Sequence, residues 1–144
     1  MPILNYTTTV PVVRTIADIQ KLLMRAKAKQ IMTEYDDDGN ATGMSFFVTV
    51  NDKPLIFKMP VDVTGVRQAM KNDPDCKNSY CRNEQYPRVA WRILKDWIEA
   101  QLAMVEANQA TVPQVFLPYA VTNNSQTVYE RLSGDGFKLL GCDK

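Results

Sequence analysis

Residues 88–108 read RVAWRILKDWIEAQLAMVEAN, and this stretch decides the fold. Its apolar side chains recur at three- and four-residue steps, which is the period of an α-helix. The apolar track is unusually wide, because Trp91, Ile98, Leu102 and Val105 flank the main line of Val89, Ala90, Ile93, Leu94, Trp97, Ala100 and Met104. We therefore expect one long helix that is covered over most of its circumference, either by its own domain or by a second molecule.

The residues before this helix predict an antiparallel meander. Three strand-like segments are separated by the turn sequences DDDGN and NDK, and they cover residues 30–35, 42–50 and 54–59. The second segment alternates Met44, Phe46, Val48 and Val50 with Ser45, Phe47 and Thr49, and the third alternates Leu55, Phe57 and Met59 with Ile56 and Lys58. One face of the sheet is plainly apolar, and the other is mixed.

The N-terminal region predicts one more strand and a helix. Residues 4–13 are rich in Thr and Val, and Pro11 would confine such a strand to a sheet edge or a strand end. Thr15 resembles a helix N-cap, with Asp18 three residues later, and the apolar spacing continues the helix to about Lys29.

The remaining segments complete the order of elements. A short helix is expected over residues 63–71, and the polar stretch 72–86 is the candidate mobile or functional loop. After the long helix, residues 111–113 open a short helical segment, and residues 127–132 fit a helix or a strand equally well. The order predicts a single α+β domain over residues 1–144, an antiparallel sheet of three to four strands with helices packed on one face.

Composition argues against several classes of function. Seventeen basic and sixteen acidic residues leave a net charge of +1, whereas proteins that bind phosphate backbones usually carry a clear basic excess. The chain has no histidine, which removes the commonest general base and the usual nucleophile pairs. We therefore expect a protein that is not an enzyme.

The cysteines do not form an obvious metal site. Cys76, Cys81 and Cys142 are one protein ligand short of a closed tetrahedral zinc site, so we expect free thiols and no cofactor. The N-terminus lacks the features of a secretory signal, and no apolar run has the length of a membrane span. These features predict a cytoplasmic protein without a membrane partner.

Several short sequences resemble small proteins encoded by bacteriophages and prophages. They are NYTT at 5–8, EYD at 34–36, VAWRILKDW at 89–97 with EAQL at 99–102, and FLPY at 116–119. The resemblance extends over nearly the whole chain and implies expression inside a bacterial cell. That group has no settled activity, so the resemblance assigns no catalytic residue.

Three groups of residues are candidate binding sites. The acidic run Asp36, Asp37 and Asp38 fits a solvated hairpin turn. It could also bind a divalent cation, imitate nucleic acid or meet a basic protein surface. The mixed sheet face, with Phe47, Ile56, Lys58 and Met32, could stack the bases of a nucleic-acid strand, with Lys58 neutralising a phosphate.

The third group lies on the long helix. Arg88, Arg92 and Lys95 form a basic track, partly neutralised if Arg92 pairs with Asp96 and Lys95 with Glu99, four residues on. Trp91 would be an interface residue if it were left uncovered, although a tryptophan at such a position more often packs in a core.

Two functions follow from these observations. The preferred one is a phage-encoded protein that binds a host or phage protein, as a host-takeover or anti-defence factor such as an inhibitor of CRISPR–Cas nucleases. The long helix could also form a homodimer. The alternative is a single-stranded nucleic-acid-binding accessory protein of phage replication or recombination. A metal-dependent hydrolase that uses the acidic run is a third hypothesis.

Overall fold

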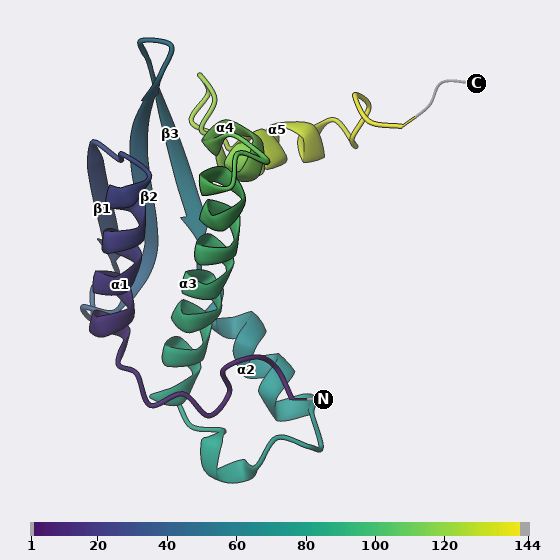
Figure 1. Cartoon of the computed structure of the whole chain (residues 1–144). Helices are drawn as coiled ribbons and strands as arrows, with labels where there is room; N and C mark the ends of the chain where they lie inside the picture. The colour runs from purple at the N-terminus through teal and green to yellow at the C-terminus, as the bar shows by residue number, and fades with distance from the viewer. Residues whose placement is uncertain (1, 142–144) are drawn as a thin grey trace.

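The structure, a computed structural model, describes residues 2–141. Within that range it contains a three-stranded antiparallel sheet, five α-helices and two short 3-10 helices (Figure 1). In chain order these are α1 (Val12–Arg25), β1 (Gln30–Tyr35), β2 (Ala41–Val50), β3 (Lys53–Pro60), α2 (Val63–Asn72), η1 (Asn78–Tyr80), α3 (Gln85–Glu106), α4 (Val112–Phe116), η2 (Leu117–Tyr119) and α5 (Val128–Gly134). The predicted α+β class, the antiparallel sheet and the long helix are confirmed.

The sheet has the order β1-β2-β3, and its strands begin and end within a residue or so of the predicted positions. Because side chains alternate along a strand, every second residue points to the same face. Phe46 and Phe57 are partners in adjacent strands, and they are only 1% and 0% exposed. Their rings stack with centroids 5.2 Å apart. This face is the sheet's contribution to the core.

Helices α1 and α3 lie on the same side of the sheet and cover this apolar face (Figure 1). Ile19 and Leu23 of α1 and Ile98 of α3 are fully buried in the core that results. Phe116 of α4, also fully buried, meets Phe46 edge to face, with ring centroids 5.4 Å apart. The fold is thus two layers, with α1, α3 and α4 packed on one face of the sheet.

The wide apolar surface of α3 is covered largely by its own chain. Trp91 is 0% exposed, and its Nε1 donates a hydrogen bond to the carbonyl oxygen of Ala41 at 3.4 Å. Trp97 is half buried and packs edge-on against Phe116 and Tyr119, with ring centroids 5.5 Å apart in each pair. Of the two explanations for this surface, cover by its own domain is the one that the structure shows.

A second, smaller apolar cluster lies where α2 packs on the first turns of α3. Met70, Tyr86 and Val89 are buried there together with Cys76. Part of the polar stretch 72–86 therefore belongs to the folded body, because Tyr86 and Gln85 already lie in α3 and are buried.

The predicted N-terminal strand over residues 4–13 does not form. Residues 4–7 make turns, and α1 begins at Val12 with Pro11 as its N-cap, four residues before the N-cap predicted at Thr15. The N–H groups of Arg14 and Thr15 both donate to the carbonyl oxygen of Pro11 at 3.1 Å. Proline fits this place because it needs no partner for an N–H group. Thr15 is fully buried inside the helix.

A residue distant in the sequence fixes the N-terminal segment. Gln85 is 3% exposed, and its Nε2 donates to the carbonyl oxygens of Tyr6 at 2.9 Å and Thr8 at 2.8 Å. These two bonds give the backbone carbonyls the partners that a neighbouring strand would otherwise supply.

The ambiguous residues 127–132 belong to a helix. Thr127 caps α5, since its hydroxyl accepts from the N–H of Glu130 at 3.2 Å and the Glu130 carboxylate accepts from the N–H of Thr127 at 3.0 Å. This reciprocal pair is the capping-box arrangement, which favours a helix start. Beyond α5 the chain extends away from the body (Figure 1). Leu139 there is 81% exposed.

Candidate functional site: the open face of the sheet

The sheet face opposite α1 and α3 is the candidate site. Side chains of paired residues in antiparallel strands point to the same face. The register places Gln30, Phe47 and Ile56 in one row, with Met32, Ser45 and Lys58 in the next and Glu34 beyond them. We call Met32, Glu34, Ser45, Phe47, Ile56 and Lys58 the open face.

The open face exposes apolar side chains that neighbour one another. Met32 is 63% exposed and Ile56 is 49% exposed, whereas Phe47 is partly buried between the flanking strands. Phe46, the residue before Phe47, is buried on the other face. Contiguous exposed apolar side chains on a small domain are typical of a contact surface for another molecule.

Helix α5 approaches one corner of the open face. A hollow of about 410 Å³ lies there, lined by residues that include Glu34, Gly43, Lys58, Tyr129 and Glu130. Tyr129 is 54% exposed. The corner therefore presents an aromatic ring beside charged groups, next to the flat apolar part of the face.

Carboxylates outnumber the lysine around this corner. The pKa of Glu130 is lowered, first by hydrogen bonds from Thr127 and then by the positive charge of Lys58. Glu34 adds a second carboxylate to the open face itself. Lys58 therefore faces acidic groups, which reduces its attraction for a phosphate backbone.

The acidic run forms the hairpin turn between β1 and β2. Oδ1 of Asp36 accepts hydrogen bonds from the N–H groups of Asp38 at 3.0 Å and Asn40 at 2.8 Å. These bonds, that from Asn40 above all, lower the pKa of Asp36. Gly39 turns the chain with φ of +84°, a conformation that favours glycine. Asp36 thus has a structural role, while Asp37 and Asp38 are exposed at the tip.

Two residues of the basic track on α3, Arg92 and Lys95, form ion pairs within the molecule. Nη1 of Arg92 donates to Oδ2 of Asp18 at 3.0 Å, so this residue joins α3 to α1 and does not pair with Asp96 as predicted. The Lys95 side chain is only 14% exposed, and its Nζ lies 3.0 Å from Oε2 of Glu99, as predicted.

Asp96 and Arg88 lie on the same helix as Arg92 and Lys95. Asp96 accepts a hydrogen bond from Nδ2 of Asn5 at 2.7 Å and so helps to hold the N-terminal segment. Arg88 is partly exposed near the start of α3. The residues of the track therefore do not form a continuous exposed basic surface.

Trp91 is not available to a partner, and the prediction that it is a binding residue is wrong for the folded chain. Its indole is completely enclosed between α3 and the sheet, because helix periodicity places it toward Ala41. With Trp91 buried and Trp97 packed on Phe116, the two tryptophans also give no reason for α3 to associate with a second copy.

The two cysteines of the loop lie close together as free thiols. Their Sγ atoms are 4.0 Å apart, and Sγ of Cys81 lies 3.7 Å from the carbonyl oxygen of Met70. Burial, followed by the neighbouring Cys81 thiol, raises the pKa of Cys76. A raised pKa disfavours the reactive thiolate. Cys142 lies outside the described residues.

A wide cleft of about 1000 Å³ runs between the β1–β2 hairpin and the starts of α1, α2 and α3. Two of the carboxylates that line it already have structural partners: Asp36 holds the hairpin, and Oδ1 of Asp62 accepts from the N–H of Gly65 at the start of α2 at 2.9 Å. Among residues 2–141, no group of three cysteine, aspartate or glutamate side chains is placed to hold a metal ion.

Part of this site was predicted from the sequence. Phe47 and Lys58 do share one face, and Met32 and Ile56 adjoin them as the alternation predicted. Tyr129 and Glu130 were missed, because nothing in the local sequence shows that α5 returns to the sheet. The bond between Val121 N–H and the carbonyl oxygen of Ile56, at 2.8 Å, is what brings that region back.

Comparison with protein families, with characterised proteins and with solved structures finds no match to this chain. In the part of the chain that the structure describes, no helix has the length and apolar character needed to cross a membrane.

Proposed function

We propose that this protein is a non-enzymatic binding module that docks another protein on the open face of its sheet. The observation that carries the proposal is the exposure of Met32 and Ile56 beside Phe47, on strands whose other face supplies the buried core residues Met44, Phe46 and Phe57. Covering such a patch removes apolar surface from water and supplies the driving force for association.

A protein partner fits the open face better than a nucleic acid does. The face has Lys58 as its cation, and Glu34 and Glu130 offset that charge. Strand-binding surfaces usually combine a positively charged groove with several aromatic rings. The open face has the ring of Phe47, with Tyr129 at its corner, and no such groove of positive charge. Mixed apolar and polar character is usual for protein interfaces.

The biological setting of the proposal comes from the resemblance to phage and prophage proteins. In that setting the chain acts in the bacterial cytoplasm as a host-takeover or anti-defence factor, of which inhibitors of CRISPR–Cas nucleases are one kind. The partner is then a host or phage protein. The proposed role requires binding and no catalytic group.

The test is affinity capture from a bacterial host followed by mass spectrometry, with matched variants of the bait. Ile56→Glu places a charge on the open face, and Met24→Glu places one on α1, where Met24 is 67% exposed. We expect the wild type and Met24→Glu to capture the same partner, and Ile56→Glu to lose most of it. Equal capture by both variants would contradict the proposal, provided that circular dichroism shows both to be folded.

The second candidate function is single-stranded nucleic-acid binding, which one observation favours. Phe47 and Lys58 are diagonal neighbours on the open face, because Phe47 pairs with Ile56 and Ser45 with Lys58. A fluorescence-anisotropy titration with a single-stranded oligonucleotide at low salt tests it. Salt-sensitive binding that Phe47→Ala or Lys58→Ala weakens would favour this function, and a flat titration would exclude it.

A further inference from the structure

The two edges of the sheet differ in how the chain covers them. On the outer edge of β3, Ala120 forms an isolated antiparallel bridge with Phe57, and the Val121 N–H donates to the carbonyl oxygen of Ile56 at 2.8 Å. β1 pairs with β2 alone, and no segment within residues 2–141 pairs with its other edge. An uncovered edge strand presents a row of N–H and C=O groups that another strand can bind.

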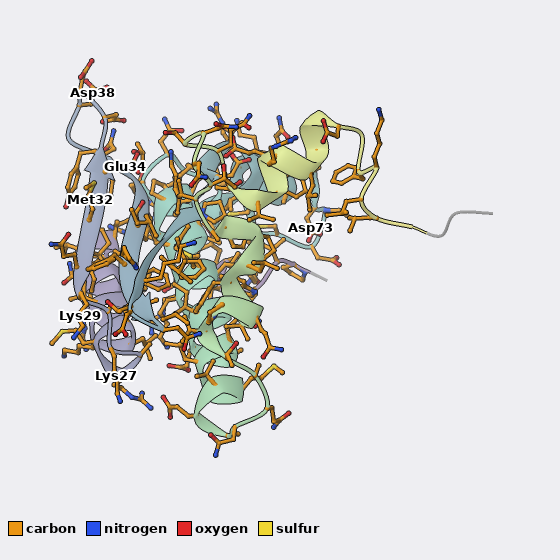
Figure 2. The ribbon with its side chains drawn as sticks, turned by 90° about the horizontal axis from the view of Figure 1, so that it is seen from above. Lys27, Lys29, Met32, Glu34, Asp38 and Asp73 are labelled. Carbon is orange, nitrogen blue, oxygen red and sulfur yellow. The ribbon has the colours of Figure 1, made fainter. Side chains whose placement is uncertain are left out.

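The uncovered edge of β1 carries opposite charges at its two ends. Lys27 and Lys29 precede the strand, while Asp37 and Asp38 follow it. None of these four side chains makes an ion pair with another residue of the described chain. Figure 2 shows the labelled side chains along β1, with the two lysines toward one end and Asp38 at the other.

The middle of β1 carries an exposed apolar side chain, and the charged residue of the strand, Glu34, lies toward its acidic end. Met32, 63% exposed, lies between the basic and acidic ends of β1. A protein edge that only needed protection from association would gain from charge along its whole length. An apolar centre between opposite charges instead matches a partner strand that has the same pattern and runs in the opposite direction.

We propose that β1 binds β1 of a second copy of this chain, antiparallel and edge to edge, as a symmetric dimer with one continuous sheet. In such a pairing the two-fold axis is perpendicular to the sheet, so the start of each β1 meets the end of the other. Lys27 and Lys29 of each copy then face Asp37 and Asp38 of the other. The strand's own sequence supplies this charge complementarity, which makes a second copy the fitting occupant.

This dimer does not depend on the proposed function. It uses backbone groups and charged side chains at the edge, and it leaves Phe47 and Ile56 of the open face exposed on both copies. Because both copies have their helices on the same side, the two open faces would join into one larger surface.

Charge reversal tests the dimer in the full chain. Sedimentation equilibrium over the micromolar range is measured for the wild type, for Lys27→Glu with Lys29→Glu, and for Asp37→Lys with Asp38→Lys. Lys71→Glu on α2, an exposed position away from the edge, is the control. We expect a dimer for the wild type and the control, weakened at least tenfold, about the effect of 1.4 kcal/mol, in each reversed variant.

Two combinations make the test specific to the antiparallel arrangement. An equimolar mixture of the two reversed variants should dimerise, because an acidic strand then meets a basic one at both ends. A chain with all four reversals should dimerise with itself. A wild-type monomer over the whole range, or a dimer insensitive to the reversals, would overturn the proposal, and so would a mixture that stays monomeric.

Discussion

Phe46 and Phe47 are adjacent in β2 and have the same side chain, yet they belong to different regions of the molecule. Phe46 is 1% exposed, stacks on Phe57 and meets Phe116, whereas Phe47 lies partly exposed beside Ile56. The covered face and the open face are made by the same strands, and the difference comes from α1 and α3, which pack on one side only. Apolar residues thus stabilise the fold on one face and are left exposed on the other.

The difference between the covered face and the open face is tested most strongly by removing one aromatic ring from each. Phe57→Ala should lower the free energy of unfolding by about 3–5 kcal/mol, because it leaves a cavity in a fully buried cluster. Phe47→Ala should lower it less, by about 1 kcal/mol, because the ring is only partly buried and its loss leaves no enclosed cavity. Urea denaturation of both variants measures the difference. Equal losses would mean that the open face is part of the core.

A second substitution tests the contact between Gln85 of α3 and the N-terminal segment. Gln85→Ala should lower the free energy of unfolding by about 1–3 kcal/mol, because the carbonyl oxygens of Tyr6 and Thr8 lose their buried partner. Amide hydrogen exchange should then rise in residues 4–10 before it rises in the sheet. Gln109→Ala, at an exposed position after α3, is the control and should change neither quantity.

The hydrogen bond from Arg92 of α3 to Asp18 of α1 makes the free energy of unfolding depend on pH. The pKa of Asp18 is lowered from its ordinary value of 3.8, first by the hydrogen bond from Arg92 and then by the charges of Arg92, Arg14 and Lys21. Folding therefore favours the charged carboxylate, and this stabilisation is present above the ordinary pKa and lost as the pH falls through the lowered one.

Asp18→Asn removes that dependence. We expect the variant to have a lower free energy of unfolding than the wild type at neutral pH. This gap should narrow at an acidic pH below the ordinary pKa of 3.8, as the pH falls through the lowered pKa and the wild-type carboxyl is protonated. Urea denaturation at the two pH values measures the gap, with Asp37→Asn at the exposed turn as the control. A gap of the same size at both pH values would show that the Arg92 contact does not act through the charge of Asp18.

The smallest effect is expected on the open face. Ile56→Glu should change the free energy of unfolding by no more than about 1 kcal/mol, since the side chain is half exposed and no helix covers it. Thermal unfolding followed by circular dichroism measures this directly. A large loss would mean that Ile56 supports the fold, and the capture experiment would then need Met32→Glu in its place.

The sequence predicted best those features that depend on local pattern. β1, β2 and β3 follow from alternation and from the DDDGN turn, in which Asp36 and Gly39 provide the hydrogen bonds and the left-handed conformation. The long helix follows from its three- and four-residue period. These signals are carried by residues that are near one another in the chain, so no tertiary information is needed to read them.

Features that depend on distant contacts could not be predicted in this way. Residues 4–13 have the composition of a strand, but Gln85 binds their carbonyl groups from the start of α3. Arg92 has an acid four residues on, yet it binds Asp18 on α1. The helical period of the sequence places Trp91 on the apolar side of the long helix. Only the structure shows that other residues of the same chain enclose its indole.

The claim that a partner binds the open face and not α1 is tested most directly by the oxidation of two methionines. Met32 on the open face and Met24 on α1 are 63% and 67% exposed, so a mild oxidant should convert both to sulfoxides at similar rates in the isolated protein at low concentration. After addition of the captured partner, the account predicts that peptide mass spectrometry will show Met32 protected and Met24 still reactive. Protection of Met24 with Met32 unchanged would contradict it.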